Sequence, residues 1–134
     1  METGLHITVI SNIIFEPHFL SLMKRQFSNN VIIFSIPFEH TEADYQTQLA
    51  VTDLIIVWLN LETLFPEQFY SLTEQNSGEI IALCKRLQTD LTSISQAKIL
   101  WFSFEEYAIP LPAAIGHTYH IFLDKLNLTL RNTL

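Results

Sequence analysis

The stretch Asp53–Leu59, which reads Asp-Leu-Ile-Ile-Val-Trp-Leu, decides the fold of this chain. Every residue after Asp53 is apolar, and the run has the length of a β-strand rather than that of a helix. A strand without alternating polar residues is typical of the centre of a parallel sheet, where both faces are covered. We therefore expect an α/β domain in which this segment is a central strand.

The segments on either side alternate between short apolar runs and longer amphipathic ones. The short runs predict three more strands, at Leu5–Ile10, Val31–Ile36 and Ala97–Phe104. Apolar residues at helical spacing predict helices from Glu16 to Phe27, over Ala43–Leu49, around Thr63–Tyr70 with an interruption at Pro66, over Gln75–Ser95 and over Tyr119–Asn132. We expect Asn76 or Ser77 to cap the Gln75–Ser95 helix.

Strands that alternate with helices call for a parallel sheet with right-handed connections. The predicted fold class is α/β, a three-layer sandwich of the SGNH-hydrolase-like or flavodoxin-like kind. Its mainly parallel sheet has four strands, or five if residues 109–121 add a short one. Residues 105–117, which include two prolines and Gly116, are expected to form a loop. The strand aromatics are expected in the core, namely Phe34, Trp58, Trp101 and Phe102.

Composition and charge narrow the class of protein. The chain has 134 residues, which suits one domain over residues 1–134. Its net charge of −7 argues against a nucleic-acid partner. The single cysteine, Cys84, excludes a disulfide scaffold and is expected to be a buried small apolar residue. The first residues lack a basic start, and no apolar run is long enough to span a membrane. We expect a cytoplasmic protein without a membrane partner.

Candidate functional residues follow the ends of the predicted strands. In open parallel sheets, ligands bind beyond the carboxyl ends of the strands. This rule selects Ser11, Asn12, Glu39, Asn60 and Glu105 after the strands, and His117 and His120 near the C-terminus. Ser and Asn at such positions also serve simply as turn residues. The two histidines have the spacing of a metal pair, but no third ligand accompanies them, so we predict no metal and no cofactor.

The layout of some of these residues resembles that of the SGNH hydrolases. The resemblance implies that Ser11 is the nucleophile, that His117 or His120 is the general base, and that Asn60 supports the oxyanion. It also implies an esterase or acyltransferase activity. Glu39, Glu105 and Asn12 would then contact a ligand at the same edge.

The chain departs from each block of that family. In the Gly-Asp-Ser block, Ile13 stands in the register of the nucleophile. The Gly-x-Asn-Asp block keeps only Asn60, and the Asp-x-x-His block lacks its acid before both histidines. We therefore expect the fold without the chemistry. A small active esterase that uses Ser11 and a late histidine is the alternative.

Three stretches resemble a second family more closely. Ile10–Pro17, Ile36-Pro37-Phe38 and Asp53–Trp58 are similar to the N-terminal region of FkbH-like proteins, which are HAD-superfamily enzymes of polyketide-type pathways. The resemblance implies an SGNH-like domain ahead of a HAD-type catalytic domain. Such enzymes dephosphorylate a phosphoglyceryl donor and load the glyceryl unit onto an acyl carrier protein.

The catalytic motif of the HAD superfamily, Asp-x-Asp-x-Thr, does not occur in this chain. We therefore expect a non-catalytic N-terminal module that works with a HAD-type domain in cis or in trans, and with an acyl carrier protein. No Lys or Arg occurs between Arg25 and Lys85, and carrier proteins are acidic. Because like charges disfavour docking, a carrier would bind near the cations, namely Lys24, Arg25, Lys85, Arg86 and Lys98.

Overall fold

The computed structural model describes residues 4–12, 21, 25, 31–37, 46–66, 71–104 and 113–134. Its strands are β1 (Leu5–Ser11), β2 (Val31–Pro37), β3 (Leu54–Trp58) and β4 (Lys98–Trp101). Its helices are α2 (Gln46–Ala50), α3 (Leu61–Leu64), α4 (Glu74–Ile94) and α5 (Ala113–Thr133). Ser21 and Arg25 are helical, and the rest of the predicted helix after Glu16 lies outside the described residues.

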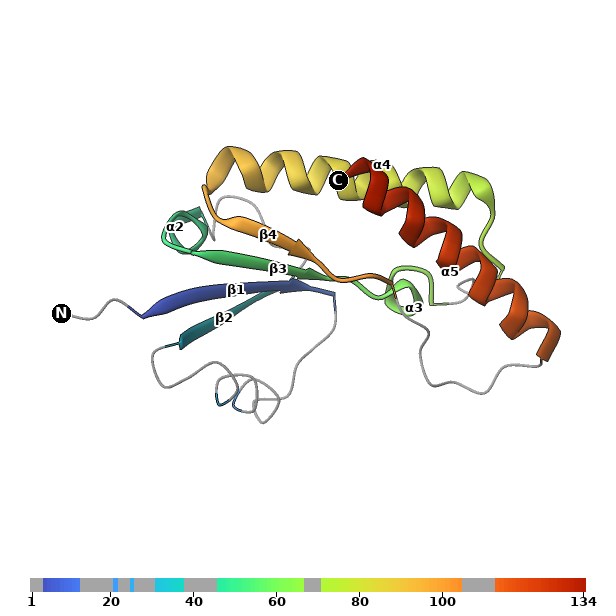
Figure 1. Ribbon diagram of the computed structural model, residues 1–134, viewed down its shortest axis with the longest axis horizontal. Coiled ribbons are helices and arrows are strands. Elements are labelled where there is room, and N and C mark those ends of the chain that lie inside the picture. The colour runs from blue at the N-terminus through green and yellow to red at the C-terminus, as the bar shows by residue number, and fades with distance from the viewer. Residues whose placement is uncertain are drawn as a thin grey trace. The chain divides into compact units, whose positions relative to one another are not determined.

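The four strands form one sheet in the order β2-β1-β3-β4, and all neighbouring pairs are parallel (Figure 1). Strand β1 lies in the interior of the sheet, with Ile7 opposite Ile33 of β2 and Leu54 of β3. All four strands lie where the sequence predicts them, to within a few residues at each end. The predicted α/β class with a parallel sheet is therefore confirmed.

The apolar strands bury their side chains on both faces of the sheet. Ile7, Val9 and Ile56 form a buried cluster, and Ile33 and Leu54 pack against it. These residues occupy alternate positions in register, so they project from one face. On the opposite face, residues such as Ile10, Ile55 and Val57 are fully buried. Burial on both faces explains why these strands lack polar alternation.

Polar bonds connect β1 to the segment that precedes β3. The His6 amide donates to the Asp53 carboxylate at 2.8 Å, and the Asp53 amide donates to the His6 carbonyl at 2.8 Å. The buried hydroxyls of Thr8 and Thr52 lie 2.7 Å apart, and Thr52 donates to the Gln48 carbonyl of α2. Since the Thr52 proton is committed to Gln48, the Thr8 hydroxyl is the donor of the pair.

The chain divides into two compact units, which we describe separately. The sheet unit comprises Met1–Leu59 and Leu91–Phe102 and contains all four strands. The helical unit comprises Asn60–Asp90 and Ser103–Leu134 and contains α3, α5 and most of α4.

Helix α4 begins with a reciprocal cap. The Thr73 hydroxyl accepts a hydrogen bond from the Asn76 amide, and the Asn76 side chain accepts from the Thr73 amide and hydroxyl, each at 2.9 Å. Thr73 is therefore the N-cap, and Asn76 reaches back to it from the third helical position in the manner of a capping box. The sequence predicts Asn76 or Ser77 as the cap, and Asn76 does take part in it, but as the third helical residue and not as the N-cap.

Helix α5 begins at Ala113, six residues before the predicted start at Tyr119. Gly116 and His117 therefore lie within a helix, and the loop predicted for residues 105–117 is wrong from Ala113 onward. The optional fifth strand is wrong over the same described part. A glycine inside a helix costs only about 1 kcal/mol. Burial of Tyr119, Leu123 and the other core residues of α5 outweighs that cost.

Within the described part of the chain, no helix has the length and apolar character that crossing a membrane requires.

Candidate functional site

Ser11 and Asn12 lie at the carboxyl end of β1, as predicted. Ser11 is the last residue of the strand and stands in register with Pro37 of β2 and Trp58 of β3. It is 3% exposed, whereas Asn12 is half-buried. The role of Ser11 as a nucleophile stays a prediction.

Aromatic side chains lie near the carboxyl ends of the strands. The rings of Trp58 and Phe102 lie 5.4 Å apart at an interplanar angle of 53°, a favourable tilted contact. The Phe102 amide donates to the Val57 carbonyl at 2.9 Å, which holds the residue against β3 beyond the end of β4. Phe102 is 39% exposed and Phe34 is 40% exposed. The prediction that these two phenylalanines lie in the core is therefore wrong, while Trp58 and Trp101 are half-buried.

Asn60 acts as the N-cap of α3. Its side-chain oxygen accepts from the Thr63 amide at 3.0 Å and from the Thr63 hydroxyl at 3.3 Å. This geometry corresponds to the turn role that Asn commonly has at a helix start. A contact of Asn60 with a ligand stays a prediction.

A second polar contact links α3 to α5 within the helical unit. The buried Tyr119 hydroxyl donates to the Glu62 carboxylate at 2.7 Å. Glu62 is not among the residues that the sequence selects, and Tyr119 enters there only as the first residue of a predicted helix. Nothing in the spacing of the two residues links them, because they lie 57 positions apart.

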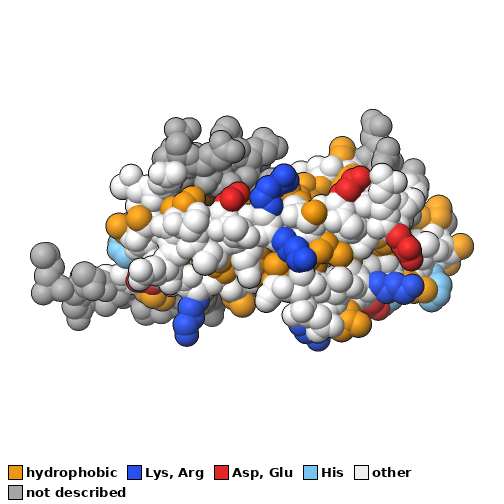
Figure 2. All heavy atoms as spheres, turned by 90° about the horizontal axis from the view of Figure 1, so that it is seen from above, with side chains coloured by type: hydrophobic (Ala, Val, Ile, Leu, Met, Phe, Trp, Pro, Cys, Tyr) orange, Lys and Arg blue, Asp and Glu red, His pale blue; other side chains and the backbone are white. Residues whose placement is uncertain are grey.

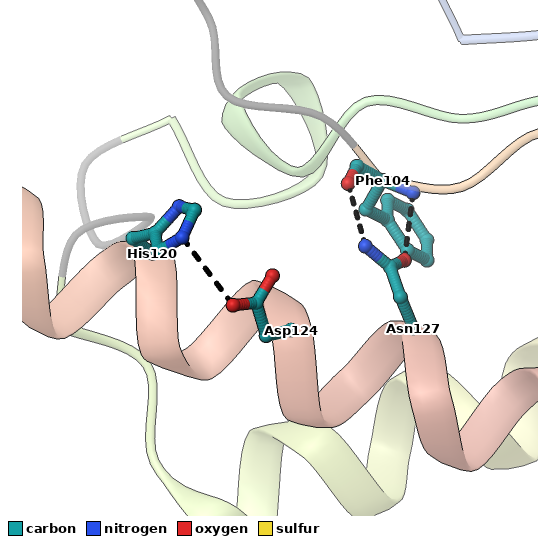
Figure 3. Close-up of polar contacts among 4 residues, drawn as sticks. All are labelled: Phe104, His120, Asp124 and Asn127. Atoms are coloured by element: carbon teal, nitrogen blue, oxygen red, sulfur yellow. Dashed lines mark hydrogen bonds and ion pairs between the residues drawn. The ribbon is translucent and has the colours of Figure 1, made fainter.

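His120 and Asp124 form a polar pair on α5 (Figure 3). The His120 Nε2 atom lies 3.3 Å from Asp124 Oδ2, and the two side chains are 59% and 68% exposed. Asp124 is therefore an acid that follows the histidine in the sequence. In the Asp-x-x-His block of the SGNH hydrolases, the acid precedes the histidine. The spacing of four residues would have revealed the pair once both were assigned to one helix.

His117 is exposed and lies one turn before His120 on the same helix. Within the described ranges, no three His, Cys, Asp or Glu side chains are grouped so as to hold a metal ion.

Asn127 anchors the segment that leaves β4. Its side-chain oxygen accepts from the Phe104 amide, and its side-chain nitrogen donates to the Phe104 carbonyl, both at 2.8 Å (Figure 3). The side-chain amide thus pairs with both backbone groups of one residue. Phe104 is the last described residue before Glu105.

The predicted site residues are divided between the two units. Ser11 and Asn12 belong to the sheet unit, whereas Asn60, His117 and His120 belong to the helical unit. Glu39 and Glu105 lie outside the described residues. The pairing of Ser11 with either histidine therefore stays a prediction.

A hollow of about 590 Å³ lies at the opposite end of the strands. It is lined by residues at the amino ends of β1 and β3, namely Gly4, Leu5, His6, Val51 and Asp53. Because ligands of parallel sheets bind at the carboxyl ends, this hollow is not the predicted site.

Exposed cations lie on both long helices and on β4. They are Lys85 and Arg86 of α4, Lys98 of β4, and Lys125 and Arg131 of α5. Figure 2 shows Lys and Arg side chains interspersed with acidic ones on the face seen there. Lys24 lies outside the described residues, and Arg25 is exposed.

No family model matches this chain, and no curated protein matches it. Among solved structures, it is similar to the N-terminal part of the protein BF1531 from Bacteroides fragilis, described as containing a phosphatase domain and complexed with Mg. The TM-score is 0.61 at 12% identity, and the match covers 97% of this chain and 37% of the other. This likeness demonstrates a shared fold.

Proposed function

We propose that this chain is a non-catalytic SGNH-like module that works with a HAD-type phosphatase domain, in the manner of the N-terminal region of FkbH-like enzymes. The observation that carries the proposal is the fold likeness to the N-terminal part of a protein that contains a phosphatase domain. The module accounts for about a third of that structure, which leaves room there for a separate catalytic domain.

Three features of the described residues support a docking role over a catalytic one. Ser11 is 3% exposed, which limits its access to a substrate. Asn60 is committed to capping α3. His120 and Asp124 are both largely exposed, so water would weaken their mutual attraction.

The enzyme that this module serves loads a glyceryl-type unit onto an acyl carrier protein. Carrier proteins are acidic, and the chain itself carries a net charge of −7. Docking therefore has to use the places where cations are exposed, and Lys85 and Arg86 are consecutive exposed residues of α4. The double variant Lys85→Glu/Arg86→Glu removes this contact surface.

The decisive experiment begins with the gene. We expect its reading frame, or a neighbouring one, to encode a strand followed by Asp-x-Asp-x-Thr. With that catalytic domain and a carrier protein in hand, loading is followed by intact-protein mass spectrometry, with and without residues 1–134. Loading should fall at least tenfold without the module, whereas hydrolysis of p-nitrophenyl phosphate should stay unchanged.

The charge-reversed double variant tests carrier docking separately. Loading should show a raised KM for the carrier with an unchanged rate at saturation. The exposed polar pair Gln75→Glu/Thr89→Glu on the same helix is the control for two introduced glutamates, and it lowers the net charge by two where the charge-reversed variant lowers it by four. Equal loading with and without the module would contradict the proposal.

A small active esterase is the second candidate, and the Asp124 carboxylate next to His120 is the observation that favours it. In this case Ser11 attacks an ester, and His120, oriented by Asp124, takes the hydroxyl proton. Hydrolysis of p-nitrophenyl acetate by the wild-type chain should then exceed that of Ser11→Ala and of His120→Ala at least a hundredfold. Rates within twofold among the three proteins would eliminate this candidate.

A further inference from the structure

We draw no further inference here: the strongest candidate, the exposed apolar patch of Leu100 and Phe102 on the β4 side of the sheet, carries none because nothing in the structure shows what covers it.

Discussion

At the residue scale, Asn127 shows how one side chain can replace a missing strand partner. The segment after β4 has left the sheet, and the Asn127 amide satisfies both backbone groups of Phe104. A buried or half-buried backbone group without a partner is costly, so the Asn127 side chain stabilises the backbone at Phe104.

We expect Asn127→Ala to lower the free energy of unfolding by about 1–3 kcal/mol, because two backbone groups lose their partner. Asn132→Ala on the same helix is exposed and should change it by less than about 0.5 kcal/mol. Urea denaturation measures both. Equal effects of the two substitutions would show that the contact with Phe104 does not stabilise the fold.

Cys84 provides a prediction of pH dependence. It is fully buried, and this burial raises the pKa of its thiol from 9.0 to about 11. The unfolded chain therefore loses the thiol proton at a lower pH than the folded chain. The contribution of this thiol to the free energy of unfolding is fully present below pH 9. It is lost as the pH rises from about 9 to about 11.

Chemical denaturation at pH 8 and pH 10.5 should show that the wild type loses about 1–2 kcal/mol more over this interval than Cys84→Ala does. Both proteins share the same lysines and tyrosines. The contribution of these residues to the change of unfolding free energy with pH therefore cancels when the two proteins are compared. Parallel pH profiles would contradict the assignment.

Residue roles were the least accessible to sequence reasoning. The positions of Ser11 and Asn60 after their strands follow from the apolar runs before them, so they could be predicted. The exposure of Phe34 could not, because it depends on β2 being an outer strand, which no local pattern encodes. The partnership of Tyr119 with Glu62 depends on how α3 and α5 pack in the helical unit.

At the element scale, periodicity located the strands and the longest helix well. Short apolar runs rich in β-branched residues are compatible only with buried strands. The predicted and observed ranges of α4 differ by one residue at each end. The beginning of α5 was missed because Pro110, Pro112 and Gly116 were read as one loop. Proline and glycine residues predict that a helix begins or ends nearby. Burial of apolar residues farther along the helix determines whether it begins before or after the glycine.

We expect the cap of α4 to contribute measurably to stability. Thr73→Ala removes the N-cap hydroxyl and should lower the free energy of unfolding by about 1 kcal/mol. Thr89→Ala in the middle of the same helix is the control, and it should be neutral or slightly stabilising because alanine has the higher helix propensity. Thermal or urea denaturation compares them, and an equal loss in both variants would exclude a specific cap.

At the scale of the whole molecule, charge dominates behaviour in solution. The acidic excess gives an isoelectric point near 5.0, where the mutual repulsion between copies disappears. Light scattering against pH should therefore show the strongest self-association near pH 5 and the weakest near neutral pH at low salt. A maximum at neutral pH would mean that charge does not control association.

The order of the strands also determines how the chain must fold. The first strand, β1, lies between β2 and β3, and the His6–Asp53 bond joins residues 47 positions apart. Strand β1 therefore pairs with β2 across a short stretch of sequence and with β3 across a longer one. Parallel pairing of this kind closes long loops, so we expect folding to be slow, on the scale of about milliseconds to seconds. The ladder between β1 and β3 therefore closes a longer loop than the ladder between β1 and β2, and we expect it to form later.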